Sequence, residues 1–230
     1  FKLFFGKCLG SANFECRQDK IYINPSDRIN YIFNSTIKGI EKSDLILLIG
    51  TNPRHEATML NARIRKAYVK NKVKIYSVGN PGDLTYPFKY IGSKTSIIKD
   101  IVSGNHELSN KIKKSKNPII ILGESVLAGR AGQYVFESMK KFLFDNNFIN
   151  EKWNSLNVLN QQASRVGALD LGITTIKENE NFNFFDKIDN DEYKFIYLLG
   201  ADNFNFEKKD KFIVYQGSHG DKGAEIADII

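Results

Sequence analysis

The stretch DLILLIGTNPRHEATMLNARIRK, residues 44–66, decides the fold of this chain. It opens with an apolar run that ends at Gly50, turns through Thr51, Asn52 and Pro53, and continues with helical periodicity. A strand, a polar turn and a helix in this order form the repeating unit of parallel α/β domains, where ligands bind at the carboxyl edge of the sheet. The stretch therefore predicts a parallel sheet whose ligand-binding edge contains the turn at Gly50, Thr51 and Asn52.

Four further apolar runs have the same form, because each is short, rich in β-branched or aromatic residues, and closed by a glycine. Nearly continuous hydrophobicity is typical of strands that are covered on both faces, as in parallel sheets. The five runs are LILLIG ending at Gly50, KIYSVG at Gly79, IIILG at Gly123, FIYLLG at Gly200 and FIVYQG at Gly217. Together they predict an α/β fold of parallel, doubly wound sheet or sheets with flanking helices.

Three segments place apolar residues on one face of a helix. Burial of a large apolar side chain contributes about 1.5–3 kcal/mol, so these faces are expected to hold the helices to the sheet. The predicted faces are Ala57, Leu60, Ile64, Ala67 and Tyr68; Val135, Phe136, Met139, Phe142 and Leu143; and Leu156, Leu159, Ala163 and Val166.

A polar segment at about 174–193 is rich in Asn, Asp, Glu and Lys and is predicted to form a surface excursion. Its residues Phe182, Phe184 and Phe185 are expected to pack back onto the domain. The residues before Lys38 have weak periodicity and predict no definite elements.

The net charge of +7, from 33 Lys and Arg against 26 Asp and Glu, favours anionic partners. The lysines, however, lie at segment ends, where they cap helices and solvate edges, and no RNA-binding signature is present. We therefore expect no nucleic-acid partner. The lysines at segment ends include Lys70, Lys72, Lys74, Lys113, Lys114 and Lys116.

No apolar run approaches the roughly 18 residues that are needed to cross a bilayer, so no membrane span is expected. The bias toward Asn, Lys, Ile, Phe and Tyr is typical of AT-rich coding sequence and suggests an organellar or parasite genome.

The cysteines and histidines predict no metal site. An iron–sulfur cluster or a structural zinc ion needs four ligands, whereas this chain has Cys8, Cys16 and three separate histidines at positions 55, 106 and 219. A disulfide is possible but not indicated, and both thiols are expected to be buried or idle.

Catalytic motifs are missing from the predicted strand ends. Neither a G-x-G-x-x-G fingerprint nor a P-loop is present. Ser125 follows the IIILG run in a near miss to the G-x-S-x-G nucleophile elbow, but Leu127 replaces the second small residue, and a helix N-cap role for Ser125 is favoured. His219 and Asp221 are expected to form a hydrogen-bonded turn. No catalytic residue is predicted.

The turn at Gly50, Thr51 and Asn52 leaves two interpretations open. The start of the following helix offers backbone N–H groups that favour an anion, so the turn could hold a phosphate or pyrophosphate. Alternatively, Thr51 and Asn52 only cap the turn and Pro53 begins the helix.

Three stretches resemble one known family. Residues 44–92, with the specific run GTNPRHEATMLNARIRK, are similar to the large iron–sulfur subunit of respiratory complex I, the NADH:ubiquinone oxidoreductase. The stretch NVLNQQASRVGALDLGI at residues 157–173 agrees with the same family, as do YLLGAD and the segment IVYQGSHGDKGAEIADII at residues 213–230. The resemblance covers the chain from about Asp27 to Ile230.

The resemblance implies a molybdopterin-oxidoreductase-like α/β region over residues 1–230. We expect this region to be incomplete at its C-terminal end and to lack the N-terminal iron–sulfur domain of the family. In molybdenum enzymes the strand–G-x-N turn touches the nucleotide of the pterin cofactor, which corresponds here to Gly50, Thr51 and Asn52. Because no clear molybdenum ligand is present, the resemblance implies a vestigial site and no cofactor in this chain.

The resemblance also implies a function. We expect a non-catalytic scaffold in the matrix arm of complex I, on the matrix side of the mitochondrial inner membrane. FMN and iron–sulfur clusters are then held by other parts of the complex, and the partners are other matrix-arm subunits, especially a cysteine-rich chain that carries the clusters. The alternative is a fragment of an active molybdopterin-dependent oxidoreductase.

Overall fold

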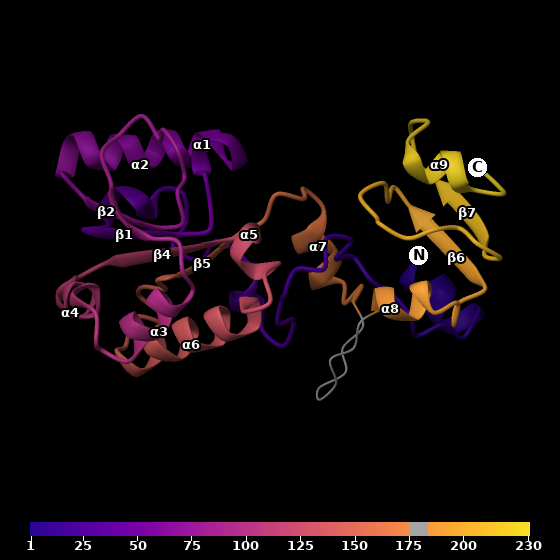
Figure 1. The fold of residues 1–230 in the computed structure, drawn as a ribbon, viewed down its shortest axis with the longest axis horizontal. Coiled ribbons are helices and arrows are strands. Elements are labelled where there is room, and N and C mark those ends of the chain that lie inside the picture. The colour runs from indigo at the N-terminus through magenta and orange to yellow at the C-terminus, as the bar shows by residue number, and fades with distance from the viewer. Residues whose placement is uncertain (175–183) are drawn as a thin grey trace. The chain divides into compact units, whose positions relative to one another are not determined.

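The computed structural model describes residues 1–174 and 184–230 and contains two compact units. The larger unit is Ile21–Asp170, and the smaller unit combines Phe1–Lys20 with Leu171–Ile230. Each unit has its own parallel sheet (Figure 1). The two units are therefore described separately.

The larger unit is built on a five-stranded, wholly parallel sheet with the order β3-β2-β1-β4-β5. Three of the predicted apolar runs form its three central strands, and the predicted fold class is confirmed. The strands are β1 (Leu45–Ile49), β2 (Lys74–Val78), β3 (Lys89–Gly92), β4 (Pro118–Gly123) and β5 (Leu156–Leu159).

β1 lies at the centre of this sheet and all five of its residues are buried. Leu45 is in register with Lys74 of β2 on one side and with Pro118 of β4 on the other. The chain adds β2 and β3 on one side of β1 and then crosses to add β4 and β5 on the other. The strand order therefore reverses between β1 and β4, which is where open α/β sheets bind ligands.

Helices cover both faces of the larger sheet (Figure 1). One face is covered by α1 (Pro53–Glu56) and α2 (Thr58–Asn71), and the other by α3 (Ser96–Val102), α4 (Glu107–Lys114) and α6 (Gly132–Asp145). The first two predicted helical faces are confirmed, because their large residues are buried or half-buried against the sheet. Those residues are Leu60, Ile64, Ala67 and Tyr68 on α2, and Val135, Phe136, Met139, Phe142 and Leu143 on α6. Ala57, also predicted on the first face, packs against the same core but is the N-cap of α2 rather than part of the helix.

The third predicted helical face is wrong. Leu156 and Leu159 belong to β5, residues 160–164 form a connection, and the helix α7 (Arg165–Asp170) begins only afterwards. A run of four residues has too few positions for periodicity to distinguish a short buried strand from a helix. Two strands, β3 and β5, were therefore absent from the prediction.

The outer edge of β5 is covered by the segment that precedes the sheet in the chain. Phe33 forms an antiparallel bridge with Asn157, and the Asn34 side chain donates to the Leu156 carbonyl oxygen at 2.6 Å. The short helices η2 (Arg28–Asn30) and η3 (Gly39–Lys42) flank this segment. A covered edge cannot add a further strand, so the sheet ends here.

The smaller unit contains the last two predicted strands, β6 (Phe195–Leu199) and β7 (Phe212–Gln216), which pair in parallel. Its core consists of Leu198, Phe204, Ile213 and Tyr215. Its helices are η1 (Phe4–Cys8), α8 (Phe184–Asp189) and α9 (Lys222–Ile226).

The predicted surface excursion at about 174–193 falls mostly outside the described residues, since 175–183 are not among them. Within its described part, α8 is present and the Phe184 ring lies 5.5 Å from the Tyr193 ring. Phe182 and the side chain of Phe185 lie outside the described part.

At the amino edge of the larger sheet, the Asp44 carboxylate joins β1 to the start of β4. It accepts hydrogen bonds from the backbone N–H groups of Lys116 at 2.8 Å and Asn117 at 3.0 Å, and from the Ser115 hydroxyl. Partial burial by itself raises the pKa of Asp44, but these donors outweigh it and hold the pKa below its ordinary value.

Asp44→Asn is expected to reduce the acid sensitivity of the larger unit. Because the pKa of Asp44 is depressed in the folded chain, its stabilisation is complete above the unfolded pKa near about 4 and is lost as the pH falls through the folded value. Urea unfolding at pH 7 and pH 3 measures this, and the variant should lose less free energy between the two conditions than the wild type. The control Asp100→Asn changes an exposed carboxylate on α3 and should keep the wild-type difference. An unchanged difference for Asp44→Asn would contradict the assignment.

Candidate functional site

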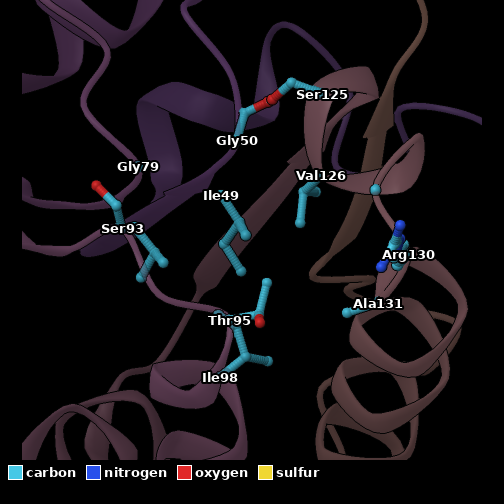
Figure 2. Close-up of a pocket in the computed structure, with 12 residues that line it drawn as sticks. Ile49, Gly50, Gly79, Ser93, Thr95, Ile98, Ser125, Val126, Arg130 and Ala131 are labelled. Carbon is cyan, nitrogen blue, oxygen red and sulfur yellow. The ribbon is translucent and has the colours of Figure 1, made fainter.

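A cleft of about 390 Å³ opens at the carboxyl edge of the larger sheet, beside the point where the strand order reverses (Figure 2). It extends from the ends of β1 and β2 to the segment that joins α5 (Glu124–Leu127) to α6. Its lining consists of Ile49, Gly50, Val78, Gly79, Ser93, Thr95, Ile98, Ser125, Val126, Gly129, Arg130 and Ala131. Of the predicted site residues, Gly50 lines the cleft, and Thr51 and Asn52 are not among its lining residues.

Gly50 is required by the close packing of α5 on the end of β1. Its φ of +58° is in the left-handed region, and a Cβ there would lie 2.7 Å from Val126 Cβ and 2.8 Å from Ser125 Oγ. The Ser125 hydroxyl donates to the Gly50 carbonyl oxygen at 2.5 Å, and Figure 2 shows the two residues in contact. The side of Gly50 that faces α5 is therefore closed by Ser125 and Val126, whereas its other side lines the cleft.

The prediction of Ser125 as a helix N-cap is wrong. Gly123 occupies the N-cap position of α5, and Ser125 is the second residue of the helix, with its hydroxyl turned to β1. The error arises because the hydroxyl finds its acceptor on another strand, which local sequence does not specify.

Gly123→Ala is expected to destabilise the larger unit by about 1–3 kcal/mol. The added Cβ would lie 2.1 Å from the Gly50 carbonyl oxygen, so either β1 or β4 must shift. Gly167→Ala in α7 is the matched control, because its Cβ meets nothing within 4 Å and alanine favours a helix. Chemical denaturation of both variants measures the effect, and equal stabilities would refute the close packing.

The polar groups of the predicted turn are bonded within the turn itself. The Glu56 carboxylate accepts from the Thr51 hydroxyl at 2.5 Å and from the Asn52 backbone N–H at 2.9 Å. The Asn52 side chain accepts from the N–H groups of Arg54 and His55 and donates to the Pro81 carbonyl oxygen at 2.6 Å. Asn52 is thus the N-cap of α1 and Pro53 its first residue.

This geometry corresponds to the capping interpretation of the turn. An anion at the turn would have to displace the Glu56 carboxylate and would be repelled by its charge. Sequence reasoning missed Glu56, although an acidic residue in the first turn after an Asn N-cap is a capping signal.

Arg130 is the cationic residue of the cleft and was also missed by the sequence reasoning. It is exposed, and Figure 2 shows it on the α5–α6 side of the cleft, away from Ser93 and Thr95. The hydroxyls and the guanidinium can form hydrogen bonds to a polar molecule. Among the described residues that line it there is no carboxylate, imidazole or thiol, so these residues offer no general base near neutral pH and no strong nucleophile.

A buried ion pair lies behind α5. Arg165 Nη1 is 2.5 Å from Glu124 Oε1, and the two side chains are 1% and 10% exposed. The same carboxylate oxygen accepts from the Gln161 backbone N–H at 2.8 Å. The pair joins the first residue of α5 to the segment after β5 and thereby fixes the helix that covers Gly50.

Cys8 and Cys16 are not joined by a disulfide; Cys8 is exposed and Cys16 is half-buried, so burial does not apply to Cys8, and the idle role remains a prediction. Cys8 ends η1, a helix without buried residues, and Cys16 lies in the irregular segment that follows. Among residues 1–174 and 184–230, no group of three or more His, Cys, Asp or Glu could hold a metal ion.

Residues 218–219 form a bend, and the hydrogen-bonded turn expected for His219 and Asp221 remains a prediction. Ser218 Oγ and His219 Nδ1 lie 2.8 Å apart, and Asp221 occupies the N-cap position of α9. His106 caps α4 by accepting from the Leu108 N–H at 3.1 Å. Within the described ranges, no helix is long and apolar enough to cross a membrane.

Comparison with known proteins finds a family and several relatives. The chain matches the family described as molybdopterin oxidoreductase over residues 2–230. It is 45% identical over 207 residues to the mitochondrial NADH-ubiquinone oxidoreductase 78 kDa subunit of Neurospora crassa, which is 88% of this chain and 26% of that protein.

It is also 45% identical over 217 residues to the NADH-ubiquinone oxidoreductase 75 kDa subunit of Reclinomonas americana, which is 93% of this chain and 31% of that protein. The mitochondrial NADH dehydrogenase [ubiquinone] iron-sulfur protein 1 of Solanum tuberosum is 38% identical over 224 residues, 96% of this chain and 29% of that protein. The chain thus spans about a quarter to a third of the length of these relatives. The resemblance predicted from the sequence is confirmed.

Proposed function

Since the chain belongs to the molybdopterin oxidoreductase family, we propose that it is a non-catalytic scaffold within the large iron–sulfur subunit of complex I. In this role it supports electron transfer from NADH to ubiquinone without reacting with either molecule. The relatives named as 75 and 78 kDa subunits of NADH-ubiquinone oxidoreductase support the assignment to that subunit.

The observation that carries the scaffold role is the internal bonding of the turn at Gly50, Thr51 and Asn52. A pterin nucleotide would need the turn's donors for its phosphates, but the Glu56 carboxylate and the Asn52 side chain already use them. Ser125 and Val126 of α5 also close one side of Gly50. The residues present do not fit the nucleotide, and the turn is a vestigial site that stabilises the fold.

The cleft supports the same conclusion by its chemistry. Electron transfer and molybdenum chemistry both need a bound redox centre, and the lining of the cleft offers neither a thiolate nor a carboxylate to ligate one. We propose that FMN and the iron–sulfur clusters are held elsewhere in the complex. This chain itself holds no cofactor.

The partners follow from this role. We propose that the chain contacts other matrix-arm subunits, especially a cysteine-rich polypeptide that carries the clusters, on the matrix side of the mitochondrial inner membrane. The word mitochondrial in the names of the relatives from Neurospora crassa and Solanum tuberosum supports the location. Nucleic acid is not a partner in this proposal.

The alternative function is that of an active molybdopterin-dependent oxidoreductase fragment. The observation that favours it is the cleft at the reversal of strand order, with the exposed Arg130 in its lining. It requires the turn at Thr51 and Asn52 to open and release Glu56.

Affinity purification of the tagged full-length chain from its own organelle tests the proposal. We expect subunits of NADH:ubiquinone oxidoreductase to co-purify, among them a cysteine-rich polypeptide with iron and acid-labile sulfide. Elemental analysis should find molybdenum and tungsten far below one atom per chain. Stoichiometric molybdenum or tungsten with a bound pterin would establish the alternative, and purification free of other complex I subunits would refute the proposal.

A further inference from the structure

We infer that the amino edge of the five-stranded sheet is a docking surface for an acidic polypeptide segment. Seven exposed lysines, called the lysine edge below, form this surface. The choice of a polypeptide as occupant rests on the proposed function, whereas the surface itself rests on the fold. The lysine edge consists of Lys42, Lys70, Lys72, Lys74, Lys113, Lys114 and Lys116.

Three hydrogen bonds, each with a lysine backbone group as donor or acceptor, bring three of these lysines together at the starts of the central strands. The Lys74 N–H donates to the Asp44 carbonyl oxygen at 3.2 Å, and the Lys116 N–H donates to the Asp44 carboxylate at 2.8 Å. The Asn117 side chain donates to the Lys42 carbonyl oxygen at 3.1 Å. Lysines that are up to 74 positions apart in the sequence thus begin three neighbouring strands, β1, β2 and β4.

The crossover helices bring the other four lysines to the same edge. In a parallel sheet, each helix that returns the chain to the next strand ends where that strand begins. Lys70 lies in the last turn of α2 and Lys72 is its C-cap, two residues before β2. Lys113 and Lys114 end α4, which Figure 1 shows at the opposite end of the sheet from α1 and α5.

The positive charge of the lysine edge is not compensated within the described part of the chain, where none of the seven lysines forms an ion pair. The neighbouring carboxylates are already engaged. Asp44 accepts from Ser115 and the backbone, and Glu41 accepts from Arg63 at 2.5 Å and Lys66 at 2.8 Å. At the end of α6, Asp145 pairs with Lys141 at 3.7 Å.

Glu107 at the start of α4 is likewise engaged. The hydrogen bond from Lys89, and after it the hydrogen bond from Lys111, lower the pKa of Glu107 to about 2. The charges of these two lysines are compensated by Glu107, so Lys89 and Lys111 are not counted in the lysine edge.

Stabilisation of helix ends explains only part of this arrangement. Basic residues near a helix C-terminus interact favourably with its dipole, which accounts for the four lysines of α2 and α4. Lys74 and Lys116 begin or precede strands and gain nothing from a helix dipole, and Lys42 ends only the four-residue helix η3. Seven like charges along one edge repel one another, so a surface of this kind is expected to bind an anion.

The neighbouring side chains favour a polypeptide over single-stranded nucleic acid. Nucleic-acid grooves combine basic residues with aromatic faces on which bases stack. Here the ammonium groups of Lys72 and Lys113 lie over the rings of Tyr68 and Phe142, at 5.5 Å and 5.7 Å from their centroids. Large apolar side chains are also exposed on α2 and on the last turn of α6, where Val69 is 58% exposed and Phe144 is 67% exposed. Protein interfaces combine such apolar contacts with a charged rim.

Binding of poly-L-glutamate to the full-length chain at low salt tests the surface directly. The triple variant Lys70→Gln, Lys74→Gln, Lys116→Gln should bind about tenfold more weakly than the wild type and with a smaller salt dependence. The control Arg65→Gln, Lys94→Gln, Lys99→Gln removes the same charge from exposed residues elsewhere in the larger unit and should change binding less than about twofold. Equal losses in both variants would overturn the inference, because net charge rather than the lysine edge would then govern binding.

Single-stranded RNA and anionic phosphatidylserine vesicles are the competing probes. If either one binds more tightly than poly-L-glutamate and loses that affinity in the triple variant, the polypeptide assignment is overturned.

Carbodiimide cross-linking of the purified assembly tests the same surface in place. We expect bonds between lysines of this edge and carboxylates of another polypeptide, with protection of these lysines from an amine-reactive reagent relative to Lys94 and Lys99. Full reactivity of the edge lysines in the assembly would overturn the inference. The poly-L-glutamate measurement needs no partner, so its failure refutes the lysine edge and leaves the proposed function standing. Failure of co-purification refutes the proposed function and, with it, the choice of a polypeptide from complex I, but not the lysine edge.

Discussion

Arg165→Ala is expected to lower the free energy of unfolding of the larger unit by about 3–5 kcal/mol. The substitution leaves the Glu124 carboxylate, whose side chain is only 10% exposed, without the guanidinium that lies 2.5 Å away. Removal of one partner of a buried pair costs more than the pair contributes, because the remaining charge stays out of water. Urea denaturation followed by circular dichroism measures the loss.

Two controls separate the charge effect from general damage. Arg28→Ala removes an exposed arginine that pairs with Asp170 at 3.0 Å, and it should change stability much less. The double variant Glu124→Leu, Arg165→Met removes both charges while keeping apolar volume and should recover most of the stability. If Arg165→Ala and the double variant are equally unstable, the loss reflects packing rather than an uncompensated charge.

Asn157→Leu is expected to cost about 3 kcal/mol, the second of the two largest effects. Asn157 is fully buried in β5. Its Oδ1 accepts a hydrogen bond from the Ser35 backbone N–H at 2.8 Å. Its Nδ2 donates to Ser35 Oγ and to the Ser155 carbonyl oxygen, each at 2.9 Å. Leucine has a similar shape but no polar atoms, so buried groups of Ser35 and β5 lose their partner, at about 1–3 kcal/mol for each unsatisfied group.

The matched control is Asn71→Leu, which removes one exposed bond from Asn71 Nδ2 to the Glu41 carbonyl oxygen. It should change stability by about 0.5 kcal/mol or less. Hydrogen exchange should also reveal faster opening of residues 31–35 in Asn157→Leu, since this residue holds the segment on the sheet edge. Unchanged protection of that segment would contradict the role assigned to Asn157.

These two residues bear on the proposed function because they stabilise the parts that surround the reversal point of the sheet. Arg165 fixes α5 over Gly50, and Asn157 closes the outer edge at β5. A scaffold acts through its shape, so both variants should reduce the amount of assembled complex, whereas Arg28→Ala and Asn71→Leu should not. Normal assembly of the destabilised variants would weaken the case for a scaffold role.

Sequence patterns predicted the central strands and the helices packed on them, because these elements bury long apolar runs. The runs ending at Gly50, Gly79 and Gly123 became β1, β2 and β4, and the faces of α2 and α6 are buried as predicted. β3 and β5 escaped prediction because they have only four residues each, and β5 carries the polar Asn157 in its interior. That asparagine is satisfied by Ser35, more than a hundred residues away in the chain.

The candidate site was predicted in position but not in its contacts. The sequence placed Gly50, Thr51 and Asn52 at the carboxyl edge and left ligand binding and capping as open alternatives. The decision depends on Glu56, Pro81 and α5, whose groups meet the turn only in the folded chain. Arg130 entered the cleft in the same way, through the packing of the α5–α6 segment.

The sequence by itself determined the fold class and the family, since the run GTNPRHEATMLNARIRK and the apolar strands are contiguous in the chain and carry their information locally. Tertiary structure alone decided that the Asn52 side chain donates to Pro81, and that seven lysines gather at one edge. The physical reason is that hydrogen bonds and charges act through short distances in space. A parallel sheet sets those distances by aligning strand starts and strand ends that are far apart along the chain.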